Sequence, residues 1–534
     1  MNPNPKQPAK NPERRVMRDS VVECACPLAL CPGGRPGYTN GYVNPTSERP
    51  TIDANAMPHH LRRVHMRLFL CLVVLTSAAM GASGPLALHP DNPHYFVYRG
   101  KPAVLITSVE HYGAVLNLDF NYTKYLDILR RDGLNLTRTF SGAYVEPVGA
   151  FNIASNTLAP MPGAFICPWA RSDTPGGANG GNKFDLNRWD EAYFKRLKDF
   201  VDKAEDRGII VEMNLFCPFY EESQWKLSPQ NADNNVNGVG KVARTNVYTL
   251  NKHGGLLPVH EAMVRKIVME LRNFDNVYYE ICNEPYFGGV TLEWQHRMAD
   301  VITETQRPFR FRHLISQNIA NNKALVQRPH PQISIFNFHY AYPPNTVTMN
   351  YRLNKAIGDN ETGFAGTNNF PYRREAWKFI LAGGGLFNHL DYSFAVGHED
   401  GTFVYPAKQP GGGNPAFRRE MRVLKDFIHS FNFIAMRPAT NVVVSKSDGL
   451  SARALAQVGS AYAIYLCETG KPTNALVRDA NIALGLPSGN YRLEWINTRT
   501  GKPDKRDRVE HAGGQLALRS PPFIEDVALR ILLR

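Results

Sequence analysis

The chain of 534 residues lacks several features that would place it in a common class of protein. Half of its eight cysteines lie before residue 83, and the others are Cys167, Cys217, Cys282 and Cys467. This wide spacing excludes the close-set pairs that are typical of zinc and redox sites. After residue 82 no apolar run reaches the roughly 20 residues that a membrane-spanning helix needs.

Positive charge is in excess but is not concentrated. The formal net charge is +13, and ten Lys/Arg against five Asp/Glu in residues 1–82 account for +5 of it. The rest of the chain has neither a Lys/Arg block nor a nucleic-acid motif. We interpret the surplus as a solvated surface, so nucleic acid is not an expected partner.

The N-terminal segment divides into two parts. Residues 1–65 have no sustained apolar period, which predicts a disordered leader or a misannotated extension. Residues 66–82 have the three parts of a secretory signal peptide: Arg67 after Met66, an apolar core over 68–75, and small residues to Ala82. We therefore expect a secreted protein, extracellular or periplasmic, with its start at Met66. A long leader or a membrane anchor is the alternative.

Strand and helix signals alternate from residue 103 to residue 431. Strands are expected over 103–107, 134–140, 209–216, 277–285, 313–317, 333–339, 356–361 and 386–394. Helices with one apolar face are expected over 122–131, 190–204, 259–273, 292–305, 373–382 and 415–431. Eight strands with intervening helices predict an α/β fold, a (β/α)8 TIM barrel, over residues 86–436. The long strand-to-helix loops, 141–187, 218–258 and 395–414, predict the functional cleft at the carboxyl ends of the strands.

One of these strands ends on an acid. The run 277–285, Val-Tyr-Tyr-Glu-Ile-Cys-Asn-Glu-Pro, indicates a buried strand, and Pro285 cannot continue a sheet ladder. For Asn-Glu-Pro alone, a solvated acid at a strand exit is the simpler interpretation. The longer string resembles the fourth-strand signature of glycoside hydrolase clan A, notably the cellulase-like family 5. The resemblance implies that Glu284, preceded by Asn283, is the general acid/base.

A second carboxylate follows from the order of the strands. Glu361 ends the seventh strand, where the resemblance places the nucleophile. Glycoside cleavage needs such a pair, one acid to protonate the leaving oxygen and one to attack the anomeric carbon. Strands four and seven lie nearly opposite in an eight-stranded barrel, so we expect the retaining separation of about 5–5.5 Å. We also expect a raised pKa at Glu284 that keeps its proton near neutrality.

Other candidate residues stand near strand ends. The resemblance implies that Arg138, after strand two, lies beneath Glu361 and keeps it ionised. It also implies that His339 and Tyr340 bridge the nucleophile and the substrate. The alternatives are an ion pair at the edge of the core and a packed aromatic ring.

Further contacts to the substrate are expected from the rim. His111 and Tyr392 are candidates for hydrogen bonds to sugar hydroxyls, and Trp169 and Trp225 are candidates for stacking on sugar rings. Each of the four could instead belong to the core. Strand eight lacks the Trp that many family 5 enzymes carry there, and the acidic loop 397–401 has no assigned role.

Short alternating strands replace helices after Met436. They are expected over 461–466, 491–496, 515–518 and 527–532, which predicts a small all-β sandwich over residues 440–534. This part resembles the C-terminal sandwich of several barrel glycosidases. It has no aromatic row to favour carbohydrate binding, so a cap on the barrel is expected.

Taken together, these patterns predict a secreted, retaining glycoside hydrolase that acts on a β-linked oligo- or polysaccharide through two glutamates. No cofactor is expected, and a metal is disfavoured because strand one lacks a His-x-His pair. A non-catalytic glycan-binding barrel and a transglycosidase remain as alternatives.

Overall fold

The computed structural model describes residues 84–470, 476–477 and 479–534. These residues fall within one compact unit, Ala78–Arg534. Within the described ranges no helix is long and apolar enough to cross a membrane. The predictions for residues 1–65 and 66–82 lie outside the described residues.

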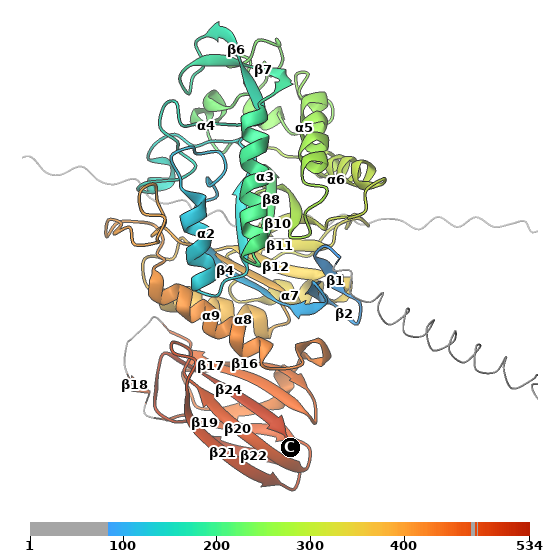
Figure 1. The fold of residues 1–534 in the computed structure, drawn as a ribbon. Helices are drawn as coiled ribbons and strands as arrows, with labels where there is room; N and C mark the ends of the chain where they lie inside the picture. The colour runs from blue at the N-terminus through green and yellow to red at the C-terminus, as the bar shows by residue number, and fades with distance from the viewer. Residues whose placement is uncertain (1–83, 471–475, 478) are drawn as a thin grey trace, which may run out of the picture. The chain divides into compact units, whose positions relative to one another are not determined.

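Eight parallel strands make up the central sheet (Figure 1). They are β4 (Leu105–Val109), β5 (Leu136–Phe140), β8 (Ile210–Phe216), β9 (Val277–Cys282), β10 (Ile315–Asn321), β11 (Ile335–His339), β12 (Ala356–Glu361) and β13 (Leu386–Leu390). Neighbours follow the order β4-β13-β12-β11-β10-β9-β8-β5. Asn135 links the two end strands, because its amide accepts from the Ile106 N–H and donates to the Val104 carbonyl, both at 2.9 Å. The sheet thus curls into a nearly closed barrel, which confirms the predicted fold class.

Helices follow the strands on the outside of this barrel (Figure 1). They are α2 (Tyr122–Arg131), α3 (Glu191–Asp206), α4 (Glu222–Leu227), α5 (Leu257–Glu270), α6 (Leu292–Gln306), α7 (Asn345–Asn350), α8 (Asn369–Leu381) and α9 (Pro415–His429). Side chains cap several of them, as where Asn121 accepts from the Lys124 N–H and Asp190 from the Tyr193 N–H. Gly133 follows α2 at φ +76°, a left-handed conformation that lets the chain turn at once into the next strand.

Two additions to the barrel were not predicted in this form. The chain enters through a three-stranded antiparallel sheet of β1 (Ala87–His89), β2 (Asn92–Tyr98) and β3 (Lys101–Ala103). The long loop after β5 contains an antiparallel hairpin of β6 (Trp169–Pro175) and β7 (Asn182–Trp189). Its alternation is masked in the sequence by Gly, Pro and Asn, which is why 141–187 was expected to be loop throughout.

The C-terminal part is all β, as predicted (Figure 1). One six-stranded sheet runs in the order β14 (Arg437–Pro438), β16 (Leu450–Gln457), β17 (Ala461–Glu468), β24 (Asp526–Leu533), β20 (Gly489–Ile496) and β21 (Pro503–His511). The smaller sheets are β15 (Val443–Lys446), β19 (Asn481–Leu486) and β22 (Gly514–Arg519), and the pair β18 (Leu476–Val477) and β23 (Phe523–Ile524). Trp495, Leu493 and Leu529 lie in their shared core. The exact boundaries 86–436 and 440–534 stay predictions.

Candidate active site

The carboxyl ends of four strands carry the candidate residues. Glu284 lies just beyond β9, Glu361 ends β12, His339 ends β11, and Tyr112 follows β4. Glu284 and Tyr112 have positive φ angles, 35° and 62°. Non-glycine residues rarely adopt this conformation, and here it turns the side chains from the strand direction into the barrel mouth.

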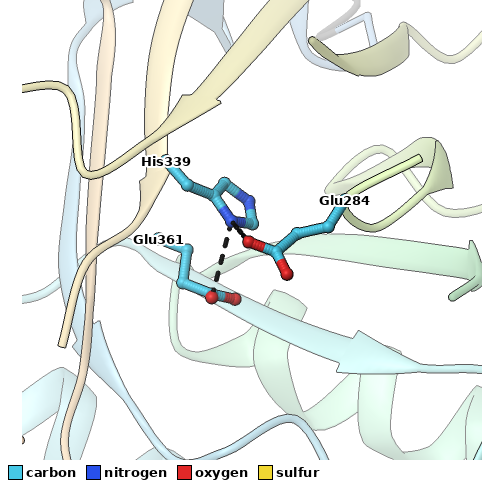
Figure 2. Close-up of side chains that lie close together, drawn as sticks. All are labelled: Glu284, His339 and Glu361. Atoms are coloured by element: carbon cyan, nitrogen blue, oxygen red, sulfur yellow. Dashed lines mark hydrogen bonds and ion pairs between the residues drawn. The ribbon is translucent and has the colours of Figure 1, made fainter. Parts of the chain in front are cut away.

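Glu284 and Glu361 face each other across His339 (Figure 2). The His339 Nδ1 atom lies 3.0 Å from Glu284 Oε1 and 3.4 Å from Glu361 Oε1. One oxygen of each carboxyl and this nitrogen all lie within 4.8 Å of one another. The two glutamates retain 8% and 6% exposure, whereas His339 is fully buried. The sequence prediction therefore named a pair that the fold does bring together.

Glu361 is held by donors from three strands. The Tyr340 hydroxyl donates to Oε1 at 2.9 Å, and the Tyr112 hydroxyl donates to Oε2 at 2.9 Å. The buried Arg138 guanidinium donates to the same Oε2 at 3.2 Å. A fixed cation and two hydroxyl donors thus engage both oxygens of this carboxyl and fix its orientation at the barrel mouth.

Glu284 has a comparable set of donors, and this corrects one expectation. The Tyr220 hydroxyl donates to Oε2 at 2.7 Å, and the Tyr286 hydroxyl donates to Oε1 at 3.2 Å. Burial acts to raise the pKa of Glu284, but the hydrogen bond and charge of His339 and the two tyrosine hydroxyls outweigh it, and the pKa lies below its ordinary value. The predicted raised pKa is therefore wrong for the ligand-free site.

A buried polar layer lies below the two glutamates. Arg138 donates to Glu280 and, at 2.7 Å, to Asn283 Oδ1. Burial raises the pKa of Glu212 well above its ordinary range, while Arg138 overcomes the effect of burial on Glu280 and lowers its pKa. Arg138 thus lies 3.8 Å from Glu212 and contacts Glu280 directly, and the two acids shift in opposite directions. The sequence signal for this layer was an acid in the middle of two apolar strands.

The site opens into a cavity of about 610 Å³. Of the predicted residues, its lining includes His111, Asn283, Glu284, Tyr340 and Glu361. Arg138 and His339 lie behind this lining and reach it through the carboxylates. The Tyr392 ring also lies behind it, with its centroid 5.9 Å from that of His111.

The two predicted tryptophan platforms are not brought to the cavity. Trp169 is fully buried in the β6–β7 hairpin. Trp225 is 3% exposed, packs on Phe219, and donates its indole N–H to the Val242 carbonyl. Both rings belong to the core of the loop region, which was the alternative interpretation of each.

A third acid lines the cavity and was missed by the sequence interpretation. Glu146, in the loop after β5, accepts from the Tyr144 hydroxyl at 3.0 Å and from Asn156. Burial raises the pKa of Glu146 to about 7. His111 Nε2 lies 4.0 Å away, and burial lowers the pKa of His111 to about 3, so its ring is neutral.

Strand eight and the acidic loop after it have structural explanations. Leu390 lines the cavity in the region where many family 5 enzymes place a tryptophan. In the loop 397–401, Glu399 Oε1 accepts from the backbone N–H groups of Gly397 and Asn121. Asp400 pairs with Lys124 at 3.3 Å. The loop therefore supports the start of α2 and does not contribute to the cavity.

Glu284, His339 and Glu361 are close enough together to hold a metal ion. Their carboxylate oxygens, however, each accept at least one hydrogen bond from a tyrosine, and Arg138 places a positive charge 3.2 Å from Glu361. A cation would have to displace these donors and overcome the repulsion from the guanidinium. The donor set thus fits an ionised carboxylate pair better than a metal centre.

Comparisons with known proteins agree with this architecture. The family model for cellulase (glycosyl hydrolase family 5) matches residues 169–368, a segment that contains Glu284, His339 and Glu361. A solved structure described as a glycoside hydrolase is 14% identical, with 84% of this chain and 97% of that chain covered and a TM-score of 0.54. A glycoside hydrolase family 5 protein from Bacteroides vulgatus ATCC 8482 is 12% identical, with 84% and 94% covered and a TM-score of 0.55. A search of curated proteins finds no match.

Residues 169–368 thus match the cellulase family model, and the fold as a whole, a barrel followed by a C-terminal β domain, is similar to that of these glycoside hydrolases.

Proposed function

We propose that the protein is a secreted, retaining glycoside hydrolase that cleaves a β-linked glycan, with Glu284 as the acid/base and Glu361 as the nucleophile. The observation that carries the proposal is a pair of nearly buried carboxylates, with one oxygen of each within 4.8 Å, at the mouth of one cavity. Retaining enzymes place their carboxyl groups about 5–5.5 Å apart, and inverting enzymes leave about 6.5–9.5 Å for a water. The short separation supports retention.

In the first step a Glu361 oxygen attacks the anomeric carbon while Glu284 gives its proton to the departing glycosidic oxygen. The bond from carbon to the leaving oxygen breaks, and a glycosyl ester of Glu361 forms. In the second step Glu284, now ionised, takes a proton from a water whose oxygen attacks the same carbon and releases Glu361. Two inversions give net retention.

Glu284 must be protonated to act as the acid, although the three groups that donate hydrogen bonds to it favour its ionised form. Binding of a substrate excludes water and places the glycosidic oxygen against this carboxyl, which favours its neutral form. His339 is close enough to exchange a proton with Glu284, because its Nδ1 atom lies 3.0 Å from Oε1. We propose that the acid becomes competent on substrate binding, with His339 as the adjacent proton partner.

The lowered pKa of Glu284 also favours the second candidate, a glycan-binding barrel without turnover. A barrel that only binds sugars needs no protonated acid, and ionised carboxylates are good acceptors of hydrogen bonds from sugar hydroxyls. The donors on Glu361 argue for catalysis, since they hold both oxygens of the proposed nucleophile in one orientation beside Arg138.

Secretion is part of the proposal and rests on the three-part leader of residues 66–82. A chain that starts at Met66 should be exported and folded like the full chain. Retention of both proteins inside the producing cell would contradict the leader assignment.

The test of the function uses a panel of 4-nitrophenyl β-D-glycosides that differ only in the sugar. Proton NMR identifies which anomer of the free sugar appears first. The β-anomer is expected, because two inversions restore the starting configuration. Early α-anomer would indicate inversion, products longer than the substrate would indicate a transglycosidase, and binding without turnover would favour the binding barrel.

A further inference from the structure

Three phenylalanines line the cavity and are unusually open to solvent. Phe151 is 39% exposed, Phe287 is 44% exposed, and Phe364 is 42% exposed. They come from the loops after β5, β9 and β12, so they belong to different parts of the rim. Exposed apolar rings around one cavity are typical of a surface that is covered when a ligand binds.

Two of these rings pack on the donors to Glu284. The centroid of Phe151 lies 5.4 Å from that of Tyr220, and the centroid of Phe287 lies 5.8 Å from Tyr220 and 5.0 Å from Tyr286. Tyr220 and Tyr286 are the hydroxyls that donate to Glu284. Phe151 and Phe287 therefore form an apolar wall on the Glu284 side, which we call the leaving-group wall.

Phe364 belongs to the other side. Its centroid lies 6.2 Å from that of Tyr340, whose hydroxyl donates to Glu361. It also contacts Tyr392, with a centroid distance of 6.3 Å. Phe364 thus provides an apolar face next to the proposed nucleophile, where the sugar ring binds.

The tyrosine hydroxyls and Asn283 beside the leaving-group wall are already engaged within the protein. The Tyr220 and Tyr286 hydroxyls donate to Glu284, and that of Tyr286 also lies 2.5 Å from Asn321 Oδ1. Asn283 accepts from Arg138 and donates to Tyr220 at 2.9 Å. A second sugar unit in this region would find few groups to replace the water on its hydroxyls.

Other polar side chains line the opposite side of the cavity. Among the cavity-lining residues that the structure describes, His111 Nδ1 and Arg374 Nε are buried without a hydrogen-bond partner, and Glu375 forms a buried acid pair with Asp359. His111 packs edge-on against Tyr112, a donor to Glu361, and Glu375 accepts from Thr362, the residue after Glu361. These residues place polar side chains on the Glu361 side of the cavity, where a sugar held against the nucleophile would lie.

We propose that the substrate is a β-glycoside whose leaving group is an apolar aglycone, aryl or alkyl, bound by Phe151 and Phe287. The inference rests on the proposed function, because the leaving group must lie beside the residue that protonates it. A single sugar then occupies the side of Glu361, His111 and Glu375. Contact with the two rings removes apolar surface of the aglycone from water, whereas the hydroxyls of a second sugar would find few groups there to replace their water.

The experiment compares three glycosides of the sugar that the 4-nitrophenyl panel identifies: the octyl glycoside, the methyl glycoside and the β-linked disaccharide. The expected kcat/KM is at least about tenfold higher for the octyl glycoside than for either of the others, since part of an alkyl chain is buried. Equal or lower kcat/KM for the octyl glycoside, with 4-nitrophenyl turnover intact, would overturn the aglycone proposal alone. Absence of turnover on every glycoside would overturn both proposals.

Variants assign the effect to the wall. Phe151→Ala and Phe287→Ala should each lower kcat/KM for the octyl glycoside about fivefold to tenfold. For the methyl glycoside, kcat/KM should stay within about twofold of the unsubstituted protein. Phe364→Ala should lower kcat/KM for all three substrates alike, because Phe364 contacts the sugar that they share. Val148→Ala, in the same loop as Phe151 but 82% exposed and outside the cavity lining, is the matched control. Equal losses on the octyl and methyl glycosides in the wall variants would contradict the assignment.

Discussion

Two buried arginines, Arg138 and Arg373, are each surrounded by acids, yet their surroundings differ. Arg138 contacts Glu280 and Glu361, and Glu361 borders the cavity. Arg373, on α8, pairs with Glu420 at 3.0 Å, Glu525 at 2.7 Å and Asp526 at 2.8 Å, where the barrel meets the C-terminal sheet. One cluster opens on a cavity, and the other is closed on all sides by protein.

The difference shows what converts a buried charge cluster into a candidate site. In the Arg373 cluster, the Tyr465 and Thr498 hydroxyls complete the hydrogen bonds of Asp526. Nothing remains for a ligand to contact, so the cluster acts on stability and on docking of the C-terminal strands. In the Arg138 cluster, Glu284 and Glu361 keep a small exposed area facing the cavity. Substitutions in the Arg373 cluster should therefore affect folding, and those in the Arg138 cluster should affect chemistry.

Apart from removal of the nucleophile itself, the largest expected effect on chemistry comes from Glu284→Gln. We expect kcat/KM to fall by about 10²–10⁴-fold on alkyl glycosides, which need a proton donor, and much less on activated aryl glycosides. The measurement is a plot of log kcat/KM against the pKa of the leaving group, which should steepen in the variant. A uniform loss across leaving groups would contradict the acid role.

On the side of stability, the largest expected effect comes from Asp526→Ala. It leaves Arg373 without one partner and removes the acceptor of two buried hydroxyls. Loss of one member of a buried pair costs about 3–5 kcal/mol. Urea unfolding should show this loss, while kcat/KM per folded molecule stays within about twofold. A large change in kcat/KM at unchanged stability would break the comparison.

The pH dependence of stability gives a third test. Asp359 and Glu375 form a buried acid pair beside Glu361, and burial raises the pKa of Glu375 from 4.5 to about 7. Because the folded state binds this proton more tightly, its stabilising contribution is full below about pH 4.5 and is lost as the pH rises through 7. Glu375→Gln should remove up to about 3 kcal/mol of this dependence. The measurement is the free energy of unfolding of both proteins at pH 5 and at pH 8. An equal change between the two pH values in both proteins would contradict the prediction.

The smallest expected effect is that of Tyr220→Phe, which should change only the pH profile of kcat/KM. Losing the hydroxyl removes a donor to Glu284, so the pKa of that carboxyl should rise. The alkaline limb of kcat/KM should then move to higher pH by about one pH unit. Tyr112→Phe, which removes a donor to Glu361, is the matched control and should leave this limb in place. An identical shift in both variants would argue against the separate roles.

Much of the barrel could be predicted because each strand has a local signal. The predicted span 356–361 is identical to β12, and the predicted helix 122–131 is identical to α2. For the strands that were predicted, the errors lie at the ends: strand one was expected at 103–107 and lies at Leu105–Val109. End positions depend on pairing with β13, which no local pattern encodes.

Residues of the site could be predicted from the sequence only where they lie at the end of a predicted strand. Glu284 and Glu361 were found because each lies at the end of a predicted strand where the resemblance to clan A places a catalytic acid. Glu146, Tyr220 and Tyr286 lie in long loops, and their positions follow from packing between segments distant in sequence. The lowered pKa of Glu284 could not be predicted for the same reason, since its donors come from three different segments. Trp169 and Trp225 show the opposite error, because an aromatic in a loop looks alike in the sequence whether it packs in the core or faces a ligand.

The central claim is that Glu361 attacks the anomeric carbon from the face opposite the leaving group. Its most direct test is the variant Glu361→Gly assayed with an activated aryl β-glycoside, with and without sodium azide. The small anion can enter the space left by the side chain and attack in its place. We expect activity to be lost without azide and restored with it, and the product to be the α-glycosyl azide. A β-glycosyl azide, or unchanged hydrolysis in the variant, would contradict the assignment of Glu361 as the nucleophile.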